Sequence, residues 1–165
     1  MSRDTRIFAF CLAGLALFIL GWATFTTFAI AHGAPQFMRW PFKVMCHGIP
    51  HRCLTMFDTK MPLCARCVGI YAGCVAGLAL FFPVMWTADG RQRTADPHPR
   101  LLSAAGWLLS GAAVPIFIDG MTQALRLRES TNPLRLATGL IVGVAFGLWA
   151  LVAIETRARQ RFAPS

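Results

Sequence analysis

The sequence predicts an all-α integral membrane protein with four transmembrane helices. Of the 165 residues, 56% are hydrophobic and only 14% are charged, and the mean hydropathy is +0.54. Lys and Arg outnumber Asp and Glu by 16 to 7, which gives a net charge of +9. These charges occur in short groups between long uncharged stretches, so the lipid bilayer is the expected partner. The composition excludes a disordered or nucleic-acid-binding tail, and we expect no nucleic-acid partner.

Four stretches approach the length that a membrane-crossing helix requires, which is about 20 apolar residues for about 30 Å of hydrocarbon. The first, residues 7–31, has no ionisable side chain except Cys11 and is followed by a Gly and a Pro that end a helix. A cleaved signal peptide is the competing interpretation, but its apolar region is typically only about 7–15 residues long. The other three spans are rich in Gly and Ala and cover residues 68–86, 101–118 and 136–154.

Small residues recur at four-residue spacing in two of these spans. Gly69, Gly73 and Gly77 lie in the second span, and Gly139, Gly143 and Gly147 lie in the fourth. Such stripes allow two helices to approach closely, so we expect the second and fourth spans to pack together. Pro83 and Pro115 lie late in the second and third spans, where a proline can kink a helix or end it.

Four spans place both termini on one side of the membrane. Each side then carries eight Lys and Arg residues, so the positive-inside rule does not select an orientation. The basic residues of segments 32–67 and 119–135 lie among Cys, His, Asp and Asn, where they would serve a site. We therefore expect a multi-pass protein of the cell (inner) membrane with both termini inside.

The segment between the first two spans, residues 32–67, concentrates the metal-binding residue types. It holds four of the six cysteines and three of the four histidines. Cys64-Ala65-Arg66-Cys67 is a CxxC motif at the start of the second span, and two thiols at this spacing bind one metal ion or form a disulfide. A helix N-terminus favours the thiolate, as does a neighbouring Arg.

Together with the CxxC motif, Cys46 and His47 provide a sulfur-rich set of ligands of the kind that zinc accepts. Adjacent Cys and His side chains diverge, so His51 or Cys53 are alternatives to His47. Cys11 and Cys74 lie within spans, and we expect them to be small buried apolar residues.

A second polar cluster follows the third span, in the predicted loop 119–135. Asp119, Gln123 and Arg126 have helical spacing and would share one face. A carboxylate so close to a span requires a partner or water, and Arg66, Arg128 and Arg135 are candidates. The hairpin topology brings this segment to the side of the membrane that carries the cysteines. The alternative interpretation of the segment is an ordinary loop with flanking charges.

These motifs together resemble the DUF2085 family, small predicted membrane proteins of bacteria and archaea that share a domain of unknown function. The resemblance covers about residues 45–145 and rests on Cys46-His47 with Pro50 and Arg52, on Pro62 to Cys67 with Gly69, Tyr71 and Gly73, on Asp119-Gly120 with Gln123, and on Arg128, Ser130, Asn132, Arg135, Thr138 and Gly139. It implies a multi-pass membrane protein whose Cys/His loop is joined to the Asp/Arg/Asn segment, but it supplies no reaction.

The resemblance also narrows the candidate sites. The family pattern has Ser in place of Cys53 and Gln or Arg in place of Gly48, which favours Cys46, His47, Cys64 and Cys67 as metal ligands. It supports a polar pocket formed by Arg52, Arg66, Tyr71, Asp119, Gln123, Arg128, Ser130, Asn132, Arg135 and Thr138.

Three functions fit these residues, and whether the protein is an enzyme is left open. The first is a metal ion, zinc in the first instance, that holds loop 32–67 on the second helix. The second is thiol redox chemistry, with Cys64 and Cys67 cycling with Cys46 and a partner protein or quinone, by analogy with four-helix membrane disulfide enzymes. The third is binding or transport of an anionic lipid headgroup or small anion through Arg66, Arg128 and Arg135.

Several catalytic classes are excluded because their motifs are missing from the sequence. There is no hydrolase triad motif, phosphate-binding Gly loop or dinucleotide fingerprint. There is also no CxxCH, because Val68 follows Cys67, so covalent c-type haem attachment is excluded.

Overall fold

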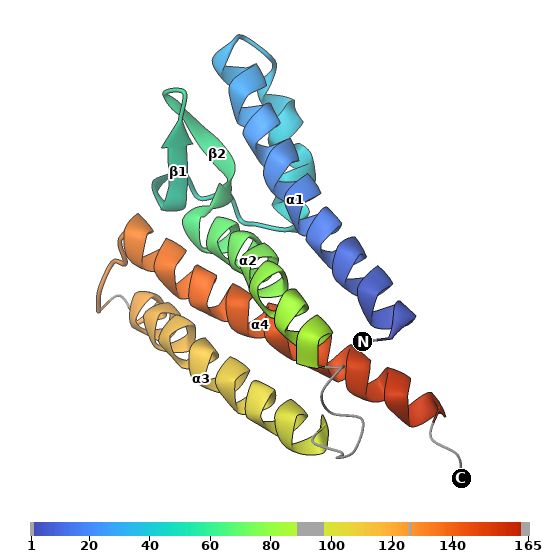
Figure 1. Ribbon diagram of the computed structural model, residues 1–165. Coiled ribbons are helices and arrows are strands. Elements are labelled where there is room, and N and C mark those ends of the chain that lie inside the picture. Colours follow the sequence, from blue (N-terminus) through green and yellow to red (C-terminus); the bar gives the residue numbers. More distant parts are fainter. Residues whose placement is uncertain (1, 89–97, 126, 163–165) are drawn as a thin grey trace.

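A computed structural model describes residues 2–88, 98–125 and 127–162 (Figure 1). Its main helices are α1 (Arg3–Ala31), α2 (Ala65–Ala88), α3 (His98–Ala124) and α4 (Asn132–Phe162). Each contains a segment long and apolar enough to cross a membrane. The prediction of four spans is therefore confirmed, and the beginning of α1 lies at the same end of the bundle as the end of α4.

The helices extend beyond the predicted spans, and at the start of α1 a side-chain cap accounts for the extension. The Ser2 side chain accepts a hydrogen bond from the backbone N–H of Thr5, so α1 begins at Arg3 rather than at residue 7. Pro83 and Pro115 end neither of their helices, since both lie inside the ranges of α2 and α3. Prolines are tolerated in membrane helices where neighbouring groups satisfy the freed backbone atoms.

Helices α2 and α4 form the closely packed centre of the bundle, with the most extensive contacts of any helix pair. A Cβ atom added to Gly77 would lie 2.6 Å from the backbone oxygen of Val144, and one added to Gly147 would lie 2.9 Å from that of Cys74. No real Cβ comes so close to a backbone atom, so only glycine permits this approach. The predicted packing of the two glycine stripes is confirmed.

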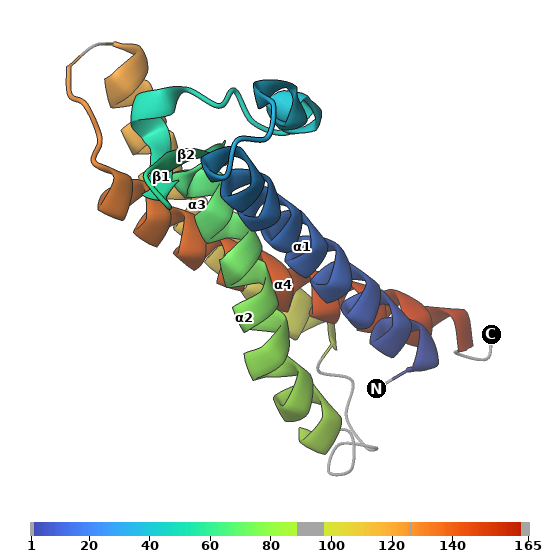
Figure 2. The ribbon, with the colours of Figure 1, turned by 90° about the horizontal axis from the view of Figure 1, so that it is seen from above.

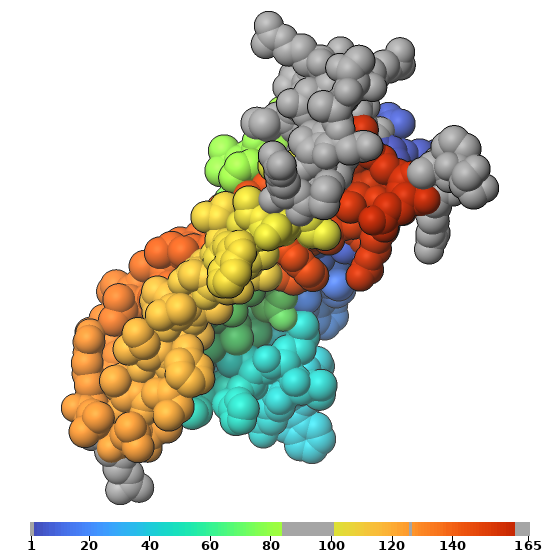
Figure 3. Space-filling view, turned by 90° about the horizontal axis from the view of Figure 1, so that it is seen from below, coloured from blue at the N-terminus to red at the C-terminus, as the bar shows by residue number. Residues whose placement is uncertain are grey.

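The two outer helices flank this pair. Helix α1 packs against α2, and α3 lies along α4 (Figures 1 and 3). Because each outer helix contacts the bundle on one side only, much of its apolar surface faces outward, where lipid would cover it. Cys74 is buried as expected, but Cys11 is exposed on α1, so the expectation of a buried Cys11 was wrong.

The segment predicted as a loop between the first two spans is folded instead. It contains two 3₁₀ helices, η1 (Gln36–Val44) and η2 (Pro50–Arg52), and an antiparallel hairpin of β1 (Cys53–Met56) and β2 (Thr59–Cys64). We call residues 36–64 the cap. The hairpin turn is formed by Phe57 and Asp58, whose φ angles are 53° and 55°. Asn-Gly or Asp-Gly usually occupies such a turn, so the residues present here did not predict a hairpin.

An apolar cluster attaches the cap to the end of the bundle. Ile19 and Ala23 of α1 meet Phe42 of η1 and Leu63 of β2 in this cluster. In Figure 2, η1 lies beside the end of α1, away from α4. Its side chains Phe37 and Trp40 are exposed next to basic residues, a combination typical of the membrane–water interface.

The predicted polar loop 119–135 is also mostly helical. Residues 119–124 belong to α3 and residues 132–135 belong to α4, so only the short stretch between them connects the helices. Arg126, which we expected to share a face with Asp119 and Gln123, lies outside the described residues.

Candidate functional site

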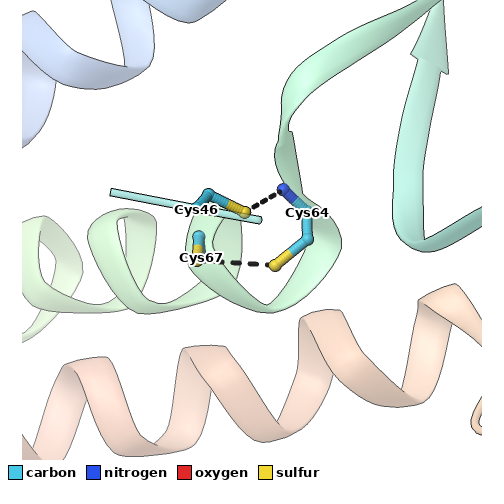
Figure 4. A group of neighbouring side chains, drawn as sticks. All are labelled: Cys46, Cys64 and Cys67. Carbon is cyan, nitrogen blue, oxygen red and sulfur yellow. Dashed lines mark hydrogen bonds between the residues drawn. The ribbon is translucent and has the colours of Figure 1, made fainter. Parts of the chain in front are cut away.

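Three cysteines from different elements converge where the cap meets α2 (Figure 4). Cys46 follows η1, Cys64 ends β2, and Cys67 lies in the first turn of α2. Their sulfur atoms all lie within 4.8 Å of one another, and the sulfurs of Cys64 and Cys67 are 3.4 Å apart. The fold thus brings the CxxC motif next to the thiol of Cys46, which lies 18 residues before Cys64 in the chain.

The hydrogen bonds of this three-cysteine group favour a thiolate at Cys64. The backbone N–H of Cys64 donates to the sulfur of Cys46 at 3.2 Å. The hydrogen bond between the two side chains of the CxxC motif, aided by backbone N–H groups of Arg66 and Cys67 and opposed by burial, lowers the pKa of Cys64 to about 5. Cys64 is therefore a thiolate at neutral pH, the form that binds metals and attacks disulfides.

The surroundings of the three-cysteine group are largely apolar. Cys46 is buried within the cluster that joins the cap to the bundle, and Met61, Leu63 and Tyr71 belong to the same cluster. A metal ion held by these thiols would be shielded from water on the cap side. Tyr71, predicted as part of the polar pocket, packs in this apolar cluster instead.

The other candidate ligands lie outside the three-cysteine group. His47 is exposed, although it follows the buried Cys46, because neighbouring side chains diverge. His51 is also exposed. Cys53 is 1% exposed, and its thiol donates to the carbonyl oxygen of Ile49 at 3.2 Å. Burial raises the pKa of Cys53 to about 11, so it stays a neutral thiol. The structure therefore assembles three of the four favoured ligands.

The second polar cluster is linked to the CxxC motif through Arg66. This residue lies between the two cysteines, and its guanidinium pairs with the carboxylate of Asp119 on α3. The side-chain amide of Gln123 donates to the same carboxylate at 2.8 Å. The prediction that the two polar clusters meet is confirmed, and the buried Asp119 has the partner it requires.

Arg135 continues this network onto α4. It donates to the side-chain oxygen of Gln123 at 3.0 Å and to that of Asn132 at 3.3 Å. The amide of Asn132 in turn donates to the backbone oxygen of Cys53 at 3.2 Å, which ties the hairpin to α4. Thr138 bonds the backbone of its own helix, while Ser130 is buried and its hydroxyl has no partner among the described residues.

A cavity of about 520 Å³ opens next to this network. It lies between η2, the end of α3 and the connection to α4. Its lining consists of His51, Arg52, Gln123, Leu127, Arg128, Glu129 and Arg135.

Sequence reasoning missed a third polar cluster, which lies at the opposite end of the bundle. Glu155 is 1% exposed and accepts hydrogen bonds from the backbone N–H of Ser2 at 2.9 Å and the hydroxyl of Thr5 at 2.7 Å. Arg159 also donates to its carboxylate at 3.0 Å. The signal available in the sequence was a single carboxylate in the last turns of a long apolar helix. This cluster fastens the start of α1 to α4.

Comparison with known proteins identifies similar sequences of uncharacterized proteins. The family described as predicted membrane protein (DUF2085) matches residues 46–149. An uncharacterized protein of Methanocaldococcus jannaschii is 37% identical over 102 residues, which cover 62% of this chain but only 58% of that protein. One of Methanothermobacter thermautotrophicus is 34% identical over 109 residues, covering 65% of this chain and 85% of that protein. No solved structure matches the chain.

Proposed function

The chain belongs to the DUF2085 family of predicted membrane proteins, and from that premise we propose that it binds one metal ion, zinc, through Cys46, Cys64 and Cys67. The observation that carries this proposal is the convergence of three sulfur atoms from three separate segments within 4.8 Å. Thiolates are the ligands of choice for structural zinc, which takes four ligands in all. The exposed His47 or a water molecule would supply the fourth.

The proposed role of the metal is structural. Bound by the three thiolates, it would join the end of η1 to the start of α2 and so hold the cap on the bundle. Arg66 lies between two of the ligands and pairs with Asp119, so an ordered CxxC motif would also support the polar network on α3 and α4. Metal binding then contributes directly to folding, as it does in other structural zinc sites.

Thiol–disulfide exchange is the second candidate, favoured by the 3.4 Å separation of the Cys64 and Cys67 sulfurs. In that reaction the Cys64 thiolate attacks a disulfide of a partner protein, forms a mixed disulfide and releases one partner thiol. Cys67 then attacks the Cys64 sulfur of the mixed disulfide, which forms the Cys64–Cys67 disulfide and releases the second partner thiol. The pair loses two electrons and two protons, and the partner disulfide is reduced to two thiols.

The metal content of the purified protein tests both functions. Elemental mass spectrometry of the full chain in detergent should find about one zinc per chain, and the Cys64→Ser/Cys67→Ser variant should have lost it. Cys53→Ser is the matched control, since it removes a buried cap thiol outside the three-cysteine group, and it should retain the metal. A chain without metal but with a Cys64–Cys67 disulfide would support redox chemistry instead. A chain with neither metal nor disulfide would refute both.

A further inference from the structure

We propose that the cavity lined by Arg52, Arg128 and Arg135 binds a phosphate group, carried either by a lipid headgroup or by a small soluble phosphate. This inference shares no residue with the proposed metal site. Metal content and phosphate binding are therefore measured separately.

The lining of the cavity is positively charged. Three guanidinium groups line it, and Glu129 is the carboxylate among its lining residues. Arg66 and Asp119 lie nearby, but they neutralise each other. The lining therefore carries a surplus of two positive charges, which favours an anion of more than one charge.

Arg135 is deeply buried, with only 4% of its surface exposed. Its two hydrogen bonds go to the neutral amide oxygens of Gln123 and Asn132 rather than to a carboxylate. Its Nε atom is buried without a partner among the described residues, as is the Nε atom of Arg52. Burying the Arg135 cation is costly, and Arg52 and Arg66 lie close enough to repel it, although Asp119, which pairs with Arg66, also attracts it. A bound anion would remove both penalties.

Phosphate is the anion whose chemistry matches this arrangement. A guanidinium donates two parallel hydrogen bonds to the oxygens of a phosphate, and several arginines around one cavity are a recurrent means of binding it. The cavity volume of 520 Å³ falls within the range of about 300–1,000 Å³ that small-molecule sites occupy. It therefore admits a phosphate together with an attached group.

The position of the cavity makes both sources of phosphate accessible. The membrane-spanning segment of α3 ends at Ala124 and that of α4 begins at Asn132, so the cavity lies at the boundary of the membrane. Leu127, one of the lining residues, is 73% exposed. Lipid headgroups lie at this depth, and soluble phosphates reach it from the aqueous side.

The thermal stability of the full chain in dodecyl maltoside, a detergent without phosphate, tests this proposal. Inorganic phosphate and phosphatidylglycerol are titrated separately, and the rise in Tm gives an apparent affinity. We expect Arg52→Gln and Arg128→Gln to weaken that affinity about tenfold or more, because each removes a charge-assisted hydrogen bond. Lys43→Gln, which removes the same charge from an exposed site in η1, should bind as the parent does.

The outcomes separate the two sources and the alternatives. A rise in Tm with inorganic phosphate identifies a soluble phosphate, and a rise with phosphatidylglycerol alone identifies a lipid headgroup. Without ligand, Arg52→Gln should be as stable as the parent or more so, because the substitution relieves the repulsion of Arg135. Such stability excludes a folding defect as the cause of lost binding. The proposal is overturned if neither compound raises the Tm of the parent, or if Lys43→Gln weakens binding as much as the cavity variants do.

Discussion

At the scale of single residues, two neighbouring cysteines show how strongly the local environment sets thiol chemistry. Cys53 and Cys64 lie opposite each other in the hairpin. The pKa of Cys64 is lowered to about 5 because hydrogen bonds stabilise its thiolate. The pKa of Cys53 is raised to about 11, chiefly because burial disfavours the charged form.

This difference predicts the order of alkylation in metal-free protein. At pH 7, iodoacetamide should modify Cys64 well before Cys53, because only Cys64 is a thiolate above pH 5. Lowering the pH through about 5 should protonate Cys64 and slow its reaction. Peptide mass spectrometry over a time course gives both rates. Equal rates for the two cysteines at pH 7 would contradict the assignment.

The pair formed by Arg66 and Asp119 predicts a loss of stability when its carboxylate is removed. Breaking a buried ion pair costs about 3–5 kcal/mol. Arg66 is 24% exposed, so water can solvate its guanidinium once the carboxylate is removed. We therefore expect Asp119→Asn to lower the free energy of unfolding by only about 1–2 kcal/mol. Thermal or denaturant unfolding in detergent measures the change.

Asp58→Asn is the matched control for that substitution. Asp58 is exposed in the hairpin turn at a φ of 55°, which Asn adopts readily, so this variant should unfold as the parent does. Equal stability of Asp119→Asn and Asp58→Asn would show that the ion pair contributes nothing.

At the scale of elements, the glycines of α4 that face α2 have a different role from a glycine of α3 that faces open space. A Cβ atom on Gly143 of α4 would lie 2.8 Å from the backbone nitrogen of Cys74, whereas one on Gly111 of α3 meets nothing within 4 Å. The first glycine allows two helices to touch. The second leaves open space beside its helix.

Alanine substitution distinguishes these two glycines. Gly143→Ala forces α2 and α4 apart and should reduce stability by about 1–3 kcal/mol, the usual cost of overpacking. Gly111→Ala should be neutral or stabilising by up to about 1 kcal/mol, because alanine favours the helix. Unfolding of both variants in the same detergent provides the comparison. If Gly111→Ala proves the more destabilising of the two, the assigned packing of α2 on α4 is wrong.

At the scale of the whole molecule, the bundle separates its polar groups between two ends. The three-cysteine group and the arginine cavity lie at the end that carries the cap, and the Glu155 cluster lies at the end where α1 begins. The orientation of the bundle therefore decides which compartment each end faces.

We expect both termini to lie in the cytoplasm and the cap to lie outside. A green fluorescent protein fused to the C-terminus should then fluoresce, and alkaline phosphatase fused at the same point should be inactive. The same pair of reporters inserted in the turn between β1 and β2 should give the opposite result. An active phosphatase at the C-terminus would reverse the orientation and place the three-cysteine group in the cytoplasm.

Much of this architecture follows from the sequence alone. The four spans follow because a hydrocarbon core selects long uncharged stretches whatever their neighbours. The contact between α2 and α4 follows because small residues recur with the period of a helix. The proximity of Cys64 and Cys67 follows because only two residues separate them in the chain.

Only the tertiary structure decided the features that depend on contacts between distant residues. It brought Cys46 to the CxxC motif and left His47 and Cys53 out of the three-cysteine group, because side-chain direction depends on the fold of the cap. It folded segment 36–64 into a cap, since its hairpin has no strong turn signal and depends on the apolar cluster beneath it. It also placed Arg52 beside Arg135, because no local pattern records which charges long-range packing brings together.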